Sequence, residues 1–115
     1  MKTEEYESVK KWFAFRKKPY AESTKKEYIG YMALWCKLAD RTPDELASED
    51  SAKMRGIIAE GMRKLGLSIR SVIDRTNAFN GFLRANGKQT KETYEGIPEP
   101  LRKEIERVVR LHKIA

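Results

Sequence analysis

Residues 23–39 read STKKEYIGYMALWCKLA, and this stretch decides the fold. Its large apolar side chains recur at helical spacing, so they share one broad face of a helix: Tyr28, Tyr31, Met32, Trp35, Leu38 and Ala39. A helix with so wide an apolar face is expected to be central and well buried. Ser23 or Thr24 is expected to cap its start, and Glu27, three residues after Thr24, completes a capping box.

The segments on both sides of this stretch are also predicted to be helical, because no strand-like alternation persists in them. Helices or helical turns are expected at 4–16, after the Thr42-Pro43 pair, from 48–50 to Gly66, from the Ser68 cap to Asn86-Gly87, and after Pro98 and Pro100. The helix before Gly66 has an expected core stripe of Met54, Ile57, Ile58, Gly61, Met62 and Leu65. The polar stretch 88–96 is expected to be a linker or long connection. The sequence therefore predicts an all-α protein.

Length and charge limit the classes of function. A chain of 115 residues has room for one domain with a modest core. It carries 24 Lys and Arg against 17 Asp and Glu, a formal net charge of +7. This excess attracts polyanions at low salt, but it does not choose among DNA, RNA and acidic lipid.

The residue types needed for catalysis or metal binding are scarce. Cys36 is the only cysteine and His112 the only histidine, so no disulfide, metal cluster or catalytic triad is expected. The glycines punctuate helices rather than forming a phosphate-binding loop. We therefore expect no enzymatic activity, no cofactor, no metal and no catalytic residue. Without a signal-like or membrane-spanning segment, an intracellular, cytoplasmic location without membrane contact is expected.

Two helices are expected to present polar stripes opposite their core faces. On 23–39 the stripe consists of Lys26, Gly30, Ala33 and Lys37. On the helix after Ser68 it consists of Arg70, Asp74, Asn77, Gly81 and Arg84, with Ser68 and Ser71 at its start. Serines and backbone N–H groups at a helix start suit a phosphate, while Arg and Asn suit guanine and adenine edges. The acidic Asp74 within this stripe is explained if it holds Arg70 at i−4. Ordinary solvated faces would carry similar residues.

The order of these segments resembles the N-terminal core-binding (SAM-like) domain of tyrosine recombinases, the phage integrase family. The resemblance rests on three segments: Ser23-Thr24-Lys25-Lys26-Glu27-Tyr28 followed by Trp35, Thr42-Pro43-Asp44-Glu45-Leu46-Ala47-Ser48-Glu49-Asp50, and Ser68-Ile69-Arg70-Ser71-Val72 through to Gly87. The order and spacing of these segments carry the resemblance. The similarity covers roughly residues 22–87.

This resemblance implies a fold and a partner. The fold would be an orthogonal four-helix bundle at 22–87, with an N-terminal helix and basic connection at 1–21. A linker and an amphipathic C-terminal helix would occupy 88–115. The partner would be double-stranded DNA, clamped near an attachment site during integration or recombination. The contacts that the resemblance implies are Ser23, Thr24, Lys25, Lys26, Ser68, Arg70, Ser71, Asp74 and Arg75. The stripes add Lys37, Asn77 and Arg84, whereas Tyr28 and Trp35 match core positions.

The family's catalytic domain has no counterpart in this sequence, which leaves several readings open. The chain is expected to be an excised domain or a protein with only the DNA-binding half, meeting a catalytic domain or sister protomers through its first or last helix. One alternative is a stand-alone DNA-binding regulator of a mobile element. Another is a helical protein-interaction module, which an exposed apolar face at Leu101, Ile105, Val108 and Val109 would favour. RNA is disfavoured because the aromatic residues lie at core spacing.

Overall fold

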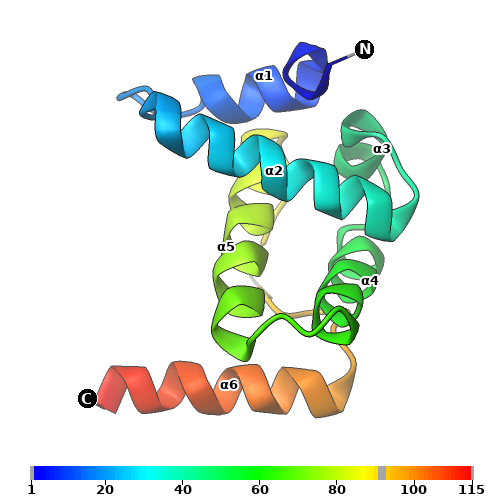
Figure 1. The fold of residues 1–115 in the computed structure, drawn as a ribbon, viewed down its shortest axis with the longest axis vertical. Coiled ribbons are helices and arrows are strands. Elements are labelled where there is room, and N and C mark those ends of the chain that lie inside the picture. Colours follow the sequence, from blue (N-terminus) through cyan, green and yellow to red (C-terminus); the bar gives the residue numbers. More distant parts are fainter. Residues whose placement is uncertain (1, 91–92, 115) are drawn as a thin grey trace.

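The computed structural model describes residues 2–90 and 93–114, and these residues form helices and connections with no strand. A 3-10 turn at Thr3–Glu5 precedes six α-helices in the described part (Figure 1): α1 (Glu7–Ala14), α2 (Glu22–Ala39), α3 (Pro43–Ser48), α4 (Ser51–Lys64), α5 (Ile69–Ala85) and α6 (Glu99–Ile114). The predicted all-α class is confirmed for this part of the chain.

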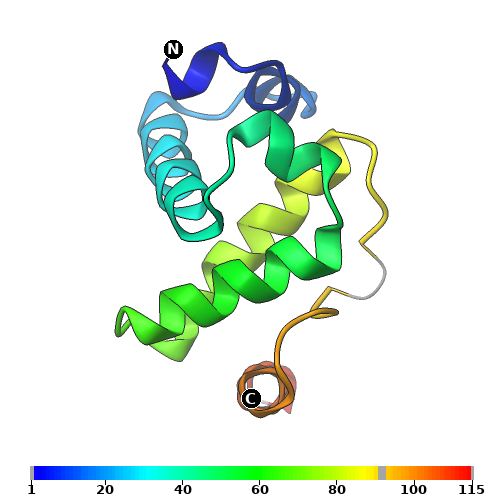
Figure 2. The ribbon, with the colours of Figure 1, turned by 90° about the vertical axis from the view of Figure 1, so that its right-hand side faces the viewer.

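The helices α4 and α5 lie side by side, and the other helices cover the two ends of this pair (Figure 1 and Figure 2). At one end α2 packs on α4, and α1 packs on α5 and on the short α3. At the opposite end α6 crosses against α5. Because α5 contacts α1, α4 and α6, it positions both ends of the molecule.

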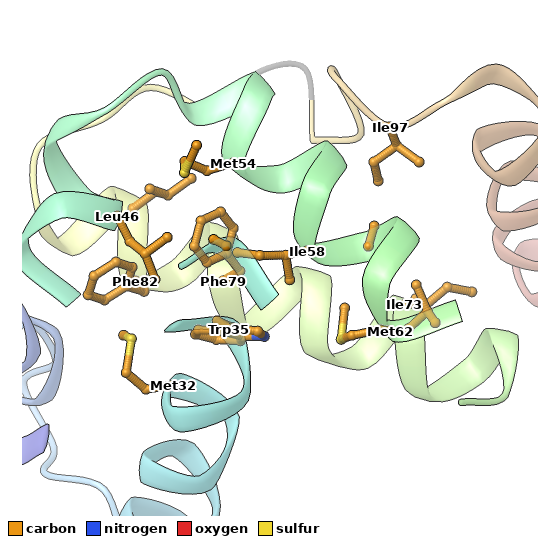
Figure 3. Close-up of a cluster of buried hydrophobic side chains, with 14 of the residues drawn as sticks. Met32, Trp35, Leu46, Met54, Ile58, Met62, Ile73, Phe79, Phe82 and Ile97 are labelled. Carbon is orange, nitrogen blue, oxygen red and sulfur yellow. The ribbon is translucent and has the colours of Figure 1, made fainter. Parts of the chain in front are cut away.

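Aromatic packing joins α2 to this central pair. Trp35 is completely buried, and its ring meets the Phe79 ring edge-on, with 5.2 Å between the centroids. Figure 3 shows Met32 and Trp35 from α2 facing side chains of α4 and α5. Trp12 of α1 joins the same cluster through contacts with Trp35 and Phe82. The predicted burial of the 23–39 helix is confirmed at Met32, Trp35 and Ala39, but its predicted central position is wrong, because α2 covers one end of the α4–α5 pair.

Two residues of the expected stripe on α4 lie outside the core. The predictions for Ile57 and Leu65 are wrong, because these side chains are 37% and 60% exposed. The buried side of α4 instead includes Arg55, Gly56 and Ala59. This side faces the segment before α6, since a Cβ on Gly56 would lie 2.0 Å from the Gly96 carbonyl oxygen. Contact with that segment turns α4 so that Ile57 faces outward.

Most of the expected helix ends are confirmed. The Thr42 hydroxyl accepts a hydrogen bond from the Glu45 N–H, while Glu45 accepts one from the Thr42 N–H, a complete capping box. Hydrogen bonding from the Thr42 backbone N–H, and then from the Thr42 side chain, lowers the pKa of the Glu45 carboxyl. At α5, the Ser68 hydroxyl accepts from the Ser71 N–H. Gly66 and Gly87 adopt positive φ angles of 88° and 82° just past the ends of α4 and α5.

The predicted start of α2 is wrong. The helix begins at Glu22 with Ala21 as its N-cap, and no side chain caps it. Ser23 and Thr24 therefore lie inside the first turn. Pro19 restricts only the residue before it, so Ala21 and Glu22 are free to start the helix earlier. A carboxylate in the first turn, here Glu22, also favours that start through the helix dipole.

The connection expected as a polar loop packs against α4 and α5 in its described part, whereas residues 91–92 lie outside the described residues. The Arg55 guanidinium donates to the Glu95 carbonyl oxygen at 2.8 Å and to the Asn80 side-chain oxygen at 2.9 Å. The Asn80 amide donates to the Thr93 carbonyl oxygen at 2.9 Å. Ile97, which follows, is 2% exposed and belongs to the core. These contacts fix the point from which α6 starts.

Among the helices of the described chain, none combines the length and the apolar character that a membrane crossing requires.

Candidate nucleic-acid interface

The predicted contact residues on α2 lie on two different faces of the helix. Lys26 and Lys37 are exposed on its outward face, and the intervening Gly30 has open space where a side chain would be. Lys25 is half-buried and lies 3.5 Å from the Glu22 carboxylate. Thr24 instead faces α5 across a groove. The basic stripe on α2 is therefore exposed as expected, but it points away from α5.

The predicted contact residues on α5 follow its solvent-facing side from the first turn to the last. Ser68, Arg70, Asp74, Asn77 and Arg84 are exposed, whereas Ser71 and Arg75 are half-buried. Arg84 at the far end donates to the Thr90 hydroxyl at 3.0 Å. The Arg75 guanidinium lies over the Tyr31 ring, 4.7 Å from its centroid, so it joins α5 to α2. The α5 stripe is thus a continuous surface that α2 borders.

Two grooves run beside this surface. The first, which we call the aromatic groove, has a volume of about 410 Å³ and lies between α2 and α5. Its lining residues are Trp12, Tyr20, Thr24, Glu27, Tyr28, Tyr31, Asp74, Asn77, Ala78 and Gly81. The second, the α5–α6 groove, has a volume of about 380 Å³ and is lined by Arg70, Ile73, Asp74, Asn77, Val108, Val109 and His112. Asp74 and Asn77 line both grooves.

The structure therefore brings together only some of the predicted contact residues. Thr24, Asp74 and Asn77 meet at the aromatic groove, and Arg70 joins the last two at the α5–α6 groove. Lys26 and Lys37 lie on another face. The alternative role for Asp74 is wrong, because no ion pair joins Arg70 and Asp74 in the described part of the chain. Asp74 thus leaves a negative charge in the middle of the α5 stripe.

Sequence reasoning missed several residues of this surface. The sequence pattern predicts a capping role for Glu27, but in the structure it accepts a hydrogen bond of 2.5 Å from the Tyr31 hydroxyl. The two residues are four positions apart, a spacing that could have identified the pair. No sequence signal could have placed Val108, Val109 and His112 beside α5, because that contact depends on how α6 crosses the bundle.

Burial raises the pKa of several groups in the described chain. The pKa of Tyr31 rises to about 12 through burial and its hydrogen bond to Glu27. Burial raises the pKa of the Cys36 thiol to about 11, and the charge of Glu45 adds to the effect. The pKa values of Tyr28 and Tyr94 are raised as well, mainly by burial. A thiol protonated at neutral pH is a poor nucleophile, in keeping with a structural role for Cys36.

These shifts predict that the protein loses stability in alkali. At a pH between the ordinary and the raised pKa, the unfolded chain has lost protons that the native state keeps. Deprotonation therefore favours unfolding, and the stabilisation present below about pH 9 disappears as the pH rises through the native pKa values. Guanidinium denaturation at pH 8, 9.5 and 10.5 should show a falling midpoint, and Cys36→Ala should reduce the fall. A midpoint that is constant over this range would contradict the prediction.

In the described residues, no group of three or more His, Cys, Asp or Glu side chains could hold a metal ion. His112 is exposed at the edge of the α5–α6 groove. In comparisons with known proteins, no family model, curated protein or solved structure matched this chain.

Proposed function

We propose that this chain binds double-stranded DNA, as the core-binding domain of an integrase-like tyrosine recombinase does. The observation that carries the proposal is the solvent-facing side of α5. Arg70, Asn77 and Arg84 are exposed along it, and neither arginine has an ion-pair partner in the described residues. Arg70 and Arg84 are 14 residues apart, which corresponds to about 21 Å of helix. Such a length can follow several base pairs of a duplex.

The start of α5 supports phosphate contact. Ser68 satisfies one N–H group of the first turn, while Ser71 and Arg70 provide a hydroxyl and a guanidinium beside the others. The net charge of +7 supplies the long-range attraction that such contacts need. Asp74 opposes this attraction locally. We therefore assign phosphate contacts to the ends of the α5 stripe rather than to its centre.

The proposal includes the finer fold and setting. Residues 22–87 would form the orthogonal four-helix, SAM-like bundle, with α1 and α6 as additions that can meet a catalytic domain or a sister protomer. The protein would be intracellular and associated with DNA, and it would act by binding rather than by catalysis. The regulator of a mobile element remains the related alternative, since it would use the same surface.

A salt series tests the proposal. The anisotropy of a labelled duplex should report binding that weakens linearly on log–log axes between about 50 and 200 mM salt. Arg70→Ala should weaken binding about three- to tenfold and lower the salt slope by about 1, since it removes one phosphate contact, and Lys26→Ala should do the same only if the outward face of α2 also meets the duplex. Lys103→Ala is the matched control, because Lys103 is exposed on α6 and already lies 3.0 Å from Glu99.

The results for the three variants show which surface of the protein binds DNA. No binding by the wild-type chain at the lowest salt would overturn the proposal. Equal losses in all three variants would indicate diffuse attraction rather than an interface on α5. An effect of Arg70→Ala alone would remove the outward stripe of α2 from the DNA surface.

A protein-interaction module is a second candidate, which the end of α6 favours. Leu101 and Ile105 are buried against the bundle, but Val108 and Val109 are half-buried and Leu111 is 57% exposed. The apolar face that would favour this function is therefore covered in its first half and open in its second. Such an open apolar segment suits contact with another protein surface.

A further inference from the structure

The walls of the aromatic groove are a packed set of rings. Trp12 and Tyr28 are stacked, with 4.8 Å between their centroids and 8° between their planes. Tyr20 meets Tyr28 edge-on at 5.1 Å, and Tyr31 lies 5.7 Å from Tyr28. These rings come from α1, α2 and the segment between them, so their mutual packing holds the groove in shape. A preformed recess with aromatic walls is typical of a binding site.

The charged groups among the described residues that line this groove are both acidic. Glu27 and Asp74 contribute carboxylates from α2 and α5, and none of the lysines and arginines that the structure describes lines the groove. Neither carboxylate forms an ion pair in the described part of the chain. The Tyr31 hydroxyl donates a hydrogen bond to Oε1 of Glu27. This hydrogen bond does not involve the second carboxylate oxygen, Oε2. The groove is therefore an acidic recess on a protein with a net charge of +7.

The rings of the groove already attract guanidinium groups at its margins. The Arg16 guanidinium lies 4.6 Å from the centroid of the Tyr20 ring, and that of Arg75 lies 4.7 Å from the centroid of the Tyr31 ring. Neither arginine lines the groove. A guanidinium suits such walls better than an ammonium does, because it is planar, weakly hydrated and able to donate two parallel hydrogen bonds to a carboxylate.

We propose that the aromatic groove binds the side chain of an arginine presented by a partner polypeptide. The guanidinium would donate hydrogen bonds to Glu27 and Asp74, and its plane would stack on a tyrosine ring. The two carboxylates inside the groove favour a cationic occupant over a phosphate, and the Arg16 and Arg75 guanidinium groups at its margins offset part of their charge. The site is therefore distinct from the phosphate contacts proposed at the ends of α5.

Titration with a short peptide tests this site. The probe is acetyl-Gly-Arg-Gly-amide. Its binding is monitored by chemical-shift changes in two-dimensional NMR spectra of the ¹⁵N-labelled chain. Its matched controls replace arginine with citrulline, which has nearly the same shape without the charge, or with lysine. The shifts should concentrate on the Trp12 indole N–H and the Asn77 side-chain amide. The citrulline and lysine peptides should bind at least about fivefold more weakly than the arginine peptide.

Two conservative variants test whether the carboxylates of the groove bind the arginine. Asp74→Asn and Glu27→Gln should each weaken arginine-peptide binding at least about fivefold, since each removes one charge-assisted acceptor. Glu60→Gln is the control, because Glu60 is an exposed carboxylate on α4 that lies 3.4 Å from Lys64. Binding that is as tight with citrulline or lysine, or that both groove variants leave unchanged, would overturn the proposal. So would shifts confined to residues outside the groove.

The same variants separate this inference from the proposed DNA binding. Asp74→Asn removes a negative charge from the α5 stripe, so its affinity for duplex DNA should rise about two- to threefold while its affinity for the arginine peptide falls. Because the two affinities change in opposite directions, one proposal can fail while the other stands.

Discussion

Gly56→Ala is expected to destabilise the protein by about 3–5 kcal/mol, because a methyl group at this position has no room. A Cβ on Gly56 would lie 2.0 Å from the Gly96 carbonyl oxygen and 2.9 Å from its carbon. A second close contact joins the same two segments, since a Cβ on Gly96 would lie 1.8 Å from the Ala52 carbonyl oxygen of α4, and Gly96 has a φ of 91°. All of these atoms belong to the backbone, so no side chain can move aside.

The cost includes the packing that follows this contact. If α4 and the turn at Gly96 separate, Ile97, Leu101 and Ile105 shift with the turn, and all three are buried against the bundle. Partial loss of their burial removes apolar stabilisation in addition to the local clash.

Gly30→Ala is the matched control for this prediction. Gly30 also lies in the middle of a long helix, but a Cβ there would meet nothing within 4 Å. Alanine is the better helix former by roughly 0.5–1 kcal/mol, so this variant should be more stable than the wild type. Urea denaturation, monitored by circular dichroism, measures the free energy of unfolding of both variants. The free energy of unfolding is expected to fall in Gly56→Ala and to rise in Gly30→Ala. A similar loss of stability in both variants would show that the tight contact with Gly96 does not cause the loss in Gly56→Ala.

Arg55→Met is expected to cost about 2–4 kcal/mol, although methionine has a similar length and is apolar. Arg55 is 3% exposed, and it holds both the Asn80 side chain and the Glu95 carbonyl oxygen by hydrogen bonds. Burial lowers the pKa of its guanidinium, which the nearby charges of Glu95 and Asp50 partly offset. Removing the donor leaves two buried or half-buried acceptors without their partner, and this loss outweighs the gain from removing a buried charge.

A double-mutant cycle isolates the interaction between Arg55 and Asn80. Asn80→Leu alone should also destabilise the protein, and the double variant should lose less than the sum of the two single losses. Arg63→Met is the control on the same helix, because Arg63 is exposed and its ion pair with Glu104 at 3.0 Å is worth at most about 1 kcal/mol. Equal losses for Arg55→Met and Arg63→Met would contradict the role that we assign to the buried arginine.

Local chemistry explains why so much of the fold could be read from the sequence. The Thr42 cap, the Ser68 cap and the glycine stops at 66 and 87 depend on residues within one turn of each other, and all are confirmed. The apolar periodicity of residues 28–39 likewise determines which side of α2 is buried. The start of α2 was misplaced because two competing local signals, the Ser23-Thr24 pair and Glu22, stand side by side.

The candidate site was predicted less completely. The sequence identified the exposed stripe of α5 and the partly exposed positions at the start of α2. It did not identify the aromatic groove, since Tyr28 and Tyr31 have the spacing of core residues yet are only half-buried, and Tyr20 lies in the connection before α2. Arg55 and Asn80 were also missed, because a buried arginine can be distinguished from a surface arginine only when its distant partners are known.

The sequence by itself determined the helical class, most helix ends and the buried sides of α2 and α5, because these follow from interactions within a few residues. Only the tertiary structure decided that α2 and α6 flank α5, that Asp74 faces Glu27 across a groove, and that Arg55 reaches Glu95 forty residues away. These outcomes depend on which apolar faces meet and at what angle. That choice minimises the exposed apolar area of the whole chain, and no local pattern encodes it.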